Sequence, residues 1–149
     1  MKRIHLIGIG GTGLSAIARV LLEMGYAVTG SDRQVSPFVR DLEAAGALVA
    51  IGHRAENVGP ADMVVRSSAI PDDNPEVLAA RAAGIPVLKR ADFLGELMTG
   101  RTGVAVAGTH GKTTTTAMIA WLLTAVKADP TFIVGGVINN LGVNAHAGK

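Results

Sequence analysis

Short β-branched runs alternate with amphipathic stretches of helix length along most of this 149-residue chain. Such alternation is typical of a parallel sheet that carries helices on its faces. The expected strands are residues 4–9, 27–30, 48–51, 63–65, 87–88, 104–107 and 132–134. Several of these runs are apolar on both faces, as in a sheet that is covered on both sides. We therefore predict an α/β fold with a Rossmann-like parallel sheet and helices on both of its faces.

Amphipathic stretches between the expected strands predict the helices. After the first expected strand, one helical stripe of apolar side chains is formed by Leu14, Ile17, Ala18, Leu21 and Leu22. This spacing is that of a helix packed on a sheet. We expect the helix to end at Gly25, and we expect further helices over residues 37–45, 75–83 and 91–98. A last helix over residues 113–126 is apolar nearly all round, so we predict that it is buried on every side.

The pattern breaks near residues 99–102, where Gly100 and Arg101 precede a fresh run of β-branched residues. We place a domain boundary there, with a first domain over residues 1–99 and the beginning of a second over residues 100–149. The second part offers a strand, a loop, a helix and one more strand before a stretch rich in glycine and asparagine. It is therefore predicted to be an incomplete P-loop α/β unit, whose open strand edges and apolar surface favour self-association.

The composition excludes several classes of protein. Hydrophobic residues make up 48% of the chain and charged residues 17%, which is not the composition of a disordered segment. The net charge of +2 is spread along the chain, and the aromatic residues are three Phe, one Trp and one Tyr, so we expect no nucleic acid partner. The absence of cysteine excludes disulfides and cysteine-based zinc sites. Glycines interrupt the apolar start, so we expect no membrane span and a cytoplasmic protein.

The first expected strand runs into the glycine motif Gly8-Ile9-Gly10-Gly11-Thr12-Gly13. Between a strand and a helix, GxGxxG allows a tight turn, a close approach of the backbone to a diphosphate, and close packing of the helix on the strand. Free N–H groups at the start of the helix favour an anion. Asp32, at the end of the second expected strand, is placed to accept hydrogen bonds from ribose hydroxyls. NAD, FAD and UDP-sugars all contain a nucleoside diphosphate, so this motif leaves the ligand open.

A second loop follows the expected strand over residues 104–107 and reads Gly108-Thr109-His110-Gly111-Lys112-Thr113. Loop amides of this kind cradle phosphate oxygens, the lysine adds a cation near the terminal phosphates, and the following hydroxyl can coordinate Mg²⁺. The common GxxxxGK[ST] pattern has glycine where this chain has Val106. A strand, a glycine loop, Gly-Lys-Thr and a helix in this order still predict a loop that binds the phosphates of ATP.

The segment GTHGKTTTT resembles the phosphate loop of the Mur ligases, and especially that of the members that add L-alanine. Further stretches are similar to the same members, namely GIGGTGLSAIA, GYAVTGSD, IGHRAENV, SSAIPDDNPE, GIPVLKRADFLGELM and DPTFIVGG. The resemblance covers essentially the whole chain. The murein peptide ligases are the nearest alternative within the family, and their first loop lacks the GIGG form that this chain has.

The resemblance implies an ATP-dependent ligase of peptidoglycan precursor synthesis. Such an enzyme activates the carboxylate of UDP-N-acetylmuramate as an acyl phosphate, which the amine of L-alanine attacks, with ATP and Mg²⁺ as cofactors. The family has three domains, which bind the UDP-sugar, ATP and the amino acid in that order. Its acidic metal ligands and its amino-acid domain have no counterpart in these 149 residues. We therefore expect a truncated ligase that binds the UDP-sugar and does not catalyse by itself.

The matched motifs assign the candidate site residues. The UDP-sugar is assigned Gly10, Gly11, Thr12, Gly13 and Asp32, together with His53, Ser67 and Ser68 on later loops at the same edge of the sheet. ATP is assigned Gly108, Thr109, His110, Gly111, Lys112, Thr113 and Thr114. Within that set, Lys112 is the expected catalytic residue and Thr113 the expected Mg²⁺ ligand.

Several polar residues also have interpretations without chemistry. We interpret His5 as a packing residue of the first strand, since one imidazole without a partner makes no site. Ser67 and Ser68 can end a strand through local hydrogen bonds, and Asp72 and Asp73 are expected to form a turn and helix cap.

Two hypotheses compete with the ligase. A nicotinamide-dependent oxidoreductase explains the first glycine motif and Asp32 but gives the second loop no role. A non-catalytic binding or regulatory module, complete as it stands, explains both loops without a reaction.

Overall fold

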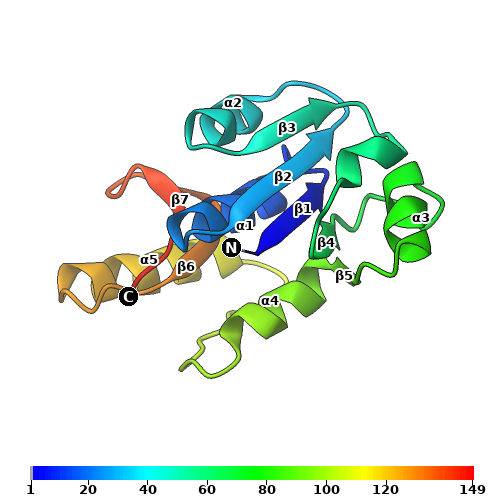
Figure 1. The fold of residues 1–149 in the computed structure, drawn as a ribbon. Coiled ribbons are helices and arrows are strands. Elements are labelled where there is room, and N and C mark those ends of the chain that lie inside the picture. The colour runs from blue at the N-terminus through cyan, green and yellow to red at the C-terminus, as the bar shows by residue number, and fades with distance from the viewer. Residues whose placement is uncertain (1) are drawn as a thin grey trace.

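The computed structural model describes residues 2–149. Five parallel strands form the main sheet, in the order β3-β2-β1-β4-β5 (Figure 1). Their bounds are Arg3–Ile7 for β1, Ala27–Asp32 for β2, Leu48–Ile51 for β3, Met63–Arg66 for β4 and Val87–Lys89 for β5. From β1 the strand order runs to one side through β2 and β3 and then to the other side through β4 and β5. The boundary between β1 and β4 is therefore the switch point at which doubly wound folds bind ligands. The predicted α/β class with a Rossmann-like parallel sheet is confirmed.

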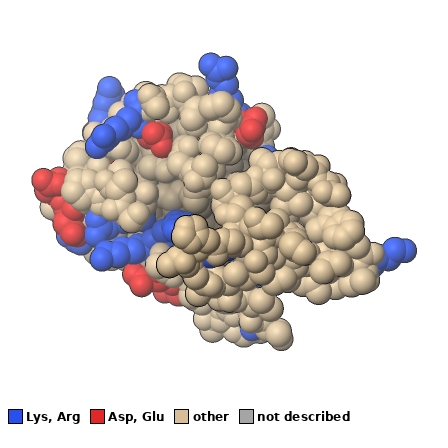
Figure 2. Space-filling model, turned by 180° about the vertical axis from the view of Figure 1, so that it is seen from behind, with Lys and Arg blue, Asp and Glu red and all other residues tan. Residues whose placement is uncertain are grey.

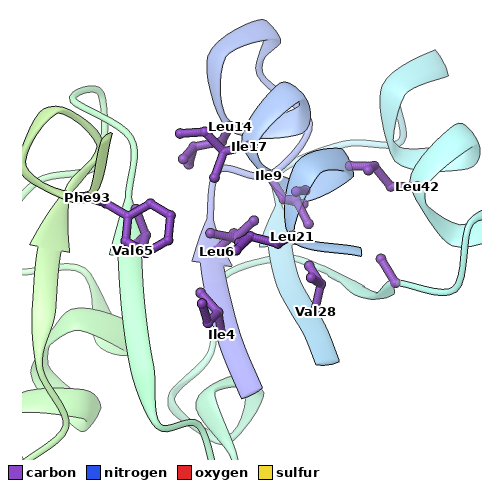
Figure 3. Packing of buried hydrophobic residues seen from close by; sticks show 12 residues of the cluster. Ile4, Leu6, Ile9, Leu14, Ile17, Leu21, Val28, Leu42, Val65 and Phe93 are labelled. Atoms are coloured by element: carbon purple, nitrogen blue, oxygen red, sulfur yellow. The ribbon is translucent and has the colours of Figure 1, made fainter. Parts of the chain in front are cut away.

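Helices cover both faces of this sheet. On one face, α1 (Thr12–Glu23), α2 (Pro37–Ala44) and α4 (Arg90–Met98) share a core that includes Leu21, Leu42 and Phe93. Figure 3 shows Phe93 beside Val65 of β4 and Leu21 beside Leu6 of β1, with Leu42 at the edge of the same cluster. The other face is covered by α3 (Pro75–Ala82) and the short 3-10 helix η1 (Ala55–Val58). The alternation along each strand therefore divides the apolar side chains between two cores.

Local signals in the sequence explain where these helices begin and end. Ser36 caps α2 by accepting a hydrogen bond from the amide of Val39, and Asn74 caps α3 in the same way. Each cap is followed by a proline, which suits the first helical position because its missing N–H is not needed there. Gly25 follows the end of α1 with a φ of +81°, a conformation that glycine adopts without strain.

The remaining elements form a smaller layer beside α1. Helix α5 (Lys112–Ala125) precedes an antiparallel hairpin of β6 (Phe132–Ile138) and β7 (Val143–His146). The hairpin packs on α1, where Ala145 is buried against Ala16 and Val20 (Figure 1). At the end of α1, the carboxylate of Glu23 accepts a hydrogen bond from the amide of Ala147 at 2.7 Å, and its Oε2 lies 3.1 Å from His146 Nδ1.

Two expectations for this smaller layer are wrong. Residues 104–107 form no strand, and Val104 is 64% exposed, because a strand needs a neighbour and β6 is paired with β7 instead. Helix α5 is not buried on every side, since its exposed side chains include Met118, Trp121 and Leu122 and its one buried residue is Ala120. The glycine- and asparagine-rich stretch, to which the sequence analysis gave no element, completes β6 and forms β7.

The charged side chains are unevenly distributed over the surface. Seen from behind, the half of the molecule that carries α5 shows almost no charged side chains, whereas the other half carries both signs (Figure 2). None of the helices in the described residues has the length and apolar character that crossing a membrane requires.

Candidate functional site

The first glycine motif forms a turn between β1 and α1. Gly8 has a φ of +85°, and its amide and that of Ile9 donate to the carbonyl of Ser31 at 2.8 and 3.0 Å. Gly11 is the N-cap of α1 and offers no side chain to the free amides of the first turn, which also contains no acidic residue. Gly11 and Thr12 are exposed. The start of α1 is therefore an open, uncapped helix terminus of the kind that binds phosphate.

Asp32 braces this turn. Its Oδ2 accepts a hydrogen bond from the amide of Gly10 at 2.8 Å, and its Oδ1 accepts one from the amide of Arg33 at 2.7 Å. A Cβ on Gly10 would lie 2.9 Å from Asp32 Oδ2 and from Val39 Cγ2, so no side chain fits there. The sequence pattern predicted a contact of Asp32 with a ribose, whereas the contacts that the structure shows for this carboxylate are with the backbone of the glycine turn and of Arg33.

The side chain of Arg90, which was not among the predicted site residues, lies over the same turn. A Cβ on Gly13 would lie 2.6 Å from Nη1 of Arg90, so the guanidinium group rests against the first turn of α1. Arg90 is exposed and begins α4 directly after the carboxyl end of β5. The position of Arg90 directly after a parallel strand could have indicated that it lies at the site, because the carboxyl ends of all five strands meet at this edge. A guanidinium here can add charge-assisted hydrogen bonds to a diphosphate.

The segment after β4 lies next to the glycine turn. A Cβ on Gly8 would lie 3.2 Å from the Cβ of Ser67, which places this serine at the switch point between β1 and β4. The Ser67 hydroxyl accepts a hydrogen bond from the amide of Ala69 at 3.3 Å, and Ser68 is exposed. The structure thus shows the local hydrogen bond expected of a strand end and also brings Ser67 to the edge where the site is expected.

His53 lies at the same edge, in contact with a buried carboxylate that the sequence did not reveal. Its Nδ1 is 3.0 Å from Ser31 Oγ and 3.5 Å from Glu76 Oε1. Glu76 is fully buried, and its Oε2 also lies 3.0 Å from Nε2 of the buried His5. His5 therefore has hydrogen-bond partners, whereas the sequence analysis interpreted it as an imidazole without a partner. These residues are distant in the chain and carry no shared motif, so pattern reading could not join them.

Glu76 is ionised at neutral pH despite its burial. Burial by itself raises the pKa of this carboxyl, and hydrogen bonds from His5, Ser31 and Asn57 outweigh it and hold the pKa at about 2. A buried charge is tolerated when its lone pairs are satisfied. In the described residues, no buried side-chain nitrogen or oxygen lacks a hydrogen-bond partner.

The second glycine loop precedes α5 and is exposed over its whole length. Gly108 has a φ of +145° and Gly111 a φ of +77°, so both use conformations that other residues rarely adopt. Gly111 is the N-cap of α5, with no side-chain cap and no acidic residue in the first turn. Thr109, His110 and Thr114 belong to the same exposed stretch. As in α1, the first amides of α5 are open to an anion.

Lys112 closes this loop on itself. Its Nζ donates to the carbonyl oxygen of Gly108 at 2.5 Å and to that of Thr109 at 3.1 Å. The ammonium group therefore lies inside the loop, at the place where a phosphate cradle has its cation. Thr113 lies against β6, because a Cβ on Gly135 would be 3.2 Å from its hydroxyl oxygen.

Metal binding has little support from protein side chains here. The described residues contain no group of three or more His, Asp or Glu side chains that could hold a metal ion. Thr113 offers one hydroxyl at the first turn of α5. The residues present fit the phosphates of a nucleotide, and a Mg²⁺ ion would depend mainly on the nucleotide and on water for its ligands.

The structure brings the two sets of candidate residues to two separate places. The turn after β1, Asp32, His53 and Ser67 lie at the carboxyl edge of the main sheet. The loop before α5 belongs to the smaller layer, where Thr113 contacts β6. Two surface hollows lie at neither place. One, of about 80 Å³, is between α1, α2 and the hairpin, and another, of about 210 Å³, is lined by Lys2, Tyr26 and Phe93.

Comparisons with known proteins show which family the chain resembles. Residues 3–102 match the family described as Mur ligase family, catalytic domain. The UDP-N-acetylmuramate–L-alanine ligase of Solidesulfovibrio magneticus is 56% identical over all 149 residues of this chain, which cover 33% of that protein. The enzyme of the same name from Bordetella petrii is 55% identical over 149 residues, which cover 32% of it. The chain thus spans about a third of the length of these curated relatives.

Solved structures show the same relationship. The UDP-N-acetylmuramate–alanine ligase of Thermotoga maritima superposes with a TM-score of 0.92 and 34% identity, over 99% of this chain and 35% of that one. A UDP-N-acetylmuramate:L-alanyl-gamma-D-glutamyl-meso-diaminopimelate ligase from Neisseria superposes with a TM-score of 0.90 and 37% identity, over 99% of this chain and 47% of that one. With the family pattern over residues 3–102 and relatives of this similarity, the chain belongs to the Mur ligase family.

Proposed function

We propose that the chain binds UDP-N-acetylmuramate and the phosphates of ATP within a ligase that joins L-alanine to this UDP-sugar. The observation that carries the proposal is the presence of two uncapped helix N-termini behind glycine loops, at α1 and α5, in one chain. Each is an anion site by its own geometry. The choice of substrates is supported by the relatives from Solidesulfovibrio and Bordetella, which are named as ligases of UDP-N-acetylmuramate and L-alanine.

The UDP-sugar is assigned to the carboxyl edge of the main sheet. In this proposal the amides of Gly11, Thr12 and Gly13 bind the diphosphate, and Gly10 and Asp32 hold the turn in place. The nucleoside half lies toward His53. Ser67 and Ser68 border the site from the loop after β4. This arrangement follows the general rule that open α/β sheets bind ligands beside the switch point.

ATP is assigned to the loop before α5. Residues 108–111 supply open backbone amides, and Lys112 exchanges its contacts with Gly108 and Thr109 for contacts with phosphate oxygens. Thr113 offers its hydroxyl to Mg²⁺, and Thr114 continues the exposed first turn. ATP supplies the phosphoryl group that activates the carboxylate of the sugar. The protein residues described here bind and orient that group and add positive charge beside it.

The two assignments divide the chain into a UDP-sugar domain over residues 1–99 and the beginning of an ATP-binding domain over residues 100–149. The exposed apolar side chains of α5, Met118, Trp121 and Leu122 among them, favour self-association of the isolated chain. We place the protein in the cytoplasm, where the nucleotide substrates are. L-Alanine has no assigned residue in this chain.

Calorimetric titration with UDP-N-acetylmuramate, MgATP and NAD in turn tests the assignment. The proposal expects saturable binding of the UDP-sugar and no response to NAD. An oxidoreductase requires the reverse, and saturable NAD binding without a response to the UDP-sugar would overturn the proposal. The oxidoreductase hypothesis also leaves the loop before α5 without a role.

Turnover by the 149-residue chain is a separate question. The reaction needs an amine held close to the activated carboxylate, and such positioning can supply roughly 7–11 kcal/mol of a barrier. No described group of acidic and histidine side chains holds a metal ion either. We therefore expect no phosphate release above background with MgATP, UDP-N-acetylmuramate and L-alanine. Release by this chain that is abolished in Lys112→Ala would contradict that expectation.

A further inference from the structure

Glu76 connects four separate segments of the main domain through one buried carboxylate. Its Oε2 accepts hydrogen bonds from Ser31 Oγ at 2.6 Å and from His5 Nε2 at 3.0 Å. Its Oε1 accepts them from Asn57 Nδ2 at 2.7 Å and from the amide of Arg54 at 3.1 Å. The four donors come from β1, the end of β2, the loop after β3 and η1. Each oxygen thus has two donors, which fills the lone pairs of a carboxylate.

Two of these contacts hold the loop that carries His53. The amide of Arg54 binds Glu76 directly, and Asn57 Nδ2 donates to the Gly52 carbonyl at 2.9 Å as well as to Glu76. The residues on both sides of His53 are therefore tied to the same carboxylate. Backbone segments held by hydrogen bonds on both sides have little freedom to move, so His53 stays at the carboxyl edge of the sheet.

A third contact fixes the hydrogen positions in this network. An ionised carboxylate only accepts hydrogen bonds, so the Ser31 hydroxyl must donate its single proton to Glu76 Oε2. Ser31 Oγ can then only accept from His53 Nδ1, which lies 3.0 Å away. A neutral His53 consequently carries its proton on Nδ1 and has an unprotonated Nε2. Among the described residues, His53 Nε2 has no hydrogen-bond partner in the protein, and the side chain is 12% exposed.

The same serine reaches the diphosphate turn. The Ser31 carbonyl accepts hydrogen bonds from the amides of Gly8 and Ile9, and the next residue, Asp32, accepts one from the amide of Gly10. The end of β2 is therefore joined to the glycine turn through its backbone and to Glu76 through the Ser31 side chain. His53 and the diphosphate turn are held in one frame.

We propose that Glu76 is a positioning residue of the UDP-sugar site, which holds the His53 loop beside the glycine turn and, through Ser31, keeps His53 Nε2 as a hydrogen-bond acceptor for a donor group of the nucleoside. This inference rests on the proposed function, because it requires a nucleoside diphosphate at the glycine turn. Glu76 does not touch the ligand, since its side chain is fully buried. A ribose hydroxyl or the imide N–H of uracil has the required chemistry.

The first test needs no mutation. Long-range ¹H–¹⁵N spectra of the histidine side chains report which ring nitrogen carries the proton, and the chain has four histidines to assign. The proposal expects the Nδ1–H tautomer for neutral His53 in the wild-type chain. An Nε2–H tautomer would overturn it, whatever the mutants show.

The second test changes the carboxylate. Glu76→Gln presents an amide N–H₂ that can donate to Ser31 Oγ, which frees the serine proton for His53 Nδ1 and shifts its tautomer to Nε2–H. Loss of one such acceptor should weaken UDP-N-acetylmuramate binding by about tenfold in calorimetry. The matched control is Asp73→Asn, which changes an exposed carboxylate nearby and should alter neither affinity nor tautomer. The inference requires both effects in Glu76→Gln, and either one without the other contradicts it.

Ser31→Ala keeps the inference testable if Glu76→Gln does not fold. It removes the link between Glu76 and His53 and leaves the other three donors of the carboxylate in place. Weaker binding together with a mixed His53 tautomer would support the proposal, and unchanged binding in a folded Ser31→Ala would overturn it. Failure of the wild-type chain to bind the UDP-sugar would instead overturn the proposed function, whereas wild-type binding that both variants retain overturns the inference alone.

Discussion

Helices α1 and α5 both begin behind a glycine without a side-chain cap, but only the loop before α1 is held by the rest of the fold. That loop is contacted by Asp32 and Ser31 of β2 and by Ser67 of the loop after β4. The loop before α5 has its lysine bound to its own carbonyl groups and follows a segment without regular structure. The same local motif is therefore rigid where a completed sheet supports it and exposed where no strand does.

Amide hydrogen exchange should show the largest difference between the two regions. Amides of β1 and β4 lie in the centre of the sheet and should open only with the whole domain, whereas residues 101–126 are mostly exposed. We expect exchange in α5 to be at least about 1000-fold faster than in β1. The hairpin of β6 and β7, which packs on α1, should be intermediate. Equal protection of α5 and β1 from exchange in a monomer would contradict the proposed difference in local stability between the two regions.

Blocking the first anion site should abolish binding of its ligand and leave the fold intact. Apart from its chain neighbours, the described atom within 4 Å of a Cβ on Gly11 is the Gly8 carbonyl oxygen at 3.5 Å. The Cβ of Gly11→Leu is therefore accommodated, and the side chain occupies the approach of the diphosphate. We expect a loss of UDP-N-acetylmuramate affinity of about 100-fold or more by calorimetry, which is about 2.7 kcal/mol. ATP binding at α5 should be unchanged.

The control for this variant is Gly95→Leu, where the structure has nothing within 4 Å of the added Cβ. That change should leave both affinities at their wild-type values. A Gly11→Leu chain that still binds the UDP-sugar tightly would show that the diphosphate does not lie on the first turn of α1.

Acid should weaken the main sheet through Glu76. Its pKa of about 2 lies below the ordinary value of 4.5, so its contribution is complete above about pH 4.5 and is lost as the pH falls toward 2. A shift of this size corresponds to at most about 3 kcal/mol of unfolding free energy. Urea unfolding between pH 5 and 2 should show the loss in the wild type and a flatter profile in Glu76→Gln.

A carboxylate of the smaller layer provides the comparison. The hydrogen bond from His146 holds the pKa of Asp129 below its ordinary value, but this carboxyl is exposed to solvent, so solvent screens its interactions. Asp129→Asn should therefore keep most of the acid dependence of the wild type. If the stability of Asp129→Asn did not depend on pH and that of Glu76→Gln fell with acid as in the wild type, the acid dependence would belong to Asp129 and not to Glu76.

Removing the loop cation should have the smallest effect of the four. Lys112→Ala removes charge-assisted hydrogen bonds worth roughly 1.5–3 kcal/mol, so ATP should bind about 10- to 100-fold more weakly. UDP-N-acetylmuramate binding should stay the same, and Lys127→Gln, at an exposed lysine beyond α5, should change neither. Equal loss of both ligands in Lys112→Ala would mean that the lysine supports the fold instead.

The sequence predicted the main sheet well because its signals are local. The stripe from Leu14 to Leu22 and the glycines at residues 8 and 25 determine a strand, a turn and a helix within a short stretch of chain. The five strands of the sheet lie at the predicted positions within a few residues. The family resemblance rested on the same local segments and is confirmed.

The errors arose where structure depends on partners distant in the chain. Residues 104–107 are β-branched and apolar as a strand should be, yet no neighbouring strand pairs with them. The Glu76 network joins residues whose positions in the chain share no pattern, and the contact of Arg90 with Gly13 depends on how β5 is placed in the sheet. A sequence pattern indicates which residue types occur at which spacing. These features depend instead on which residues come close together in the folded chain, so no sequence pattern indicates them.

Helix α1 connects the first glycine turn to the hairpin of the smaller layer. Its amino end forms the diphosphate turn, and its carboxyl end is fastened to the hairpin through Glu23, His146 and the amide of Ala147. Twelve residues of helix span about 18 Å, and such a length does not stretch. The hairpin follows α5 in the chain and packs on α1 through Ala145 as well as through Glu23. Moving the hairpin relative to the main sheet must therefore carry α1 with it or break both contacts. In the proposed function, the distance between the UDP-sugar and ATP therefore depends in part on this contact at the carboxyl end of α1.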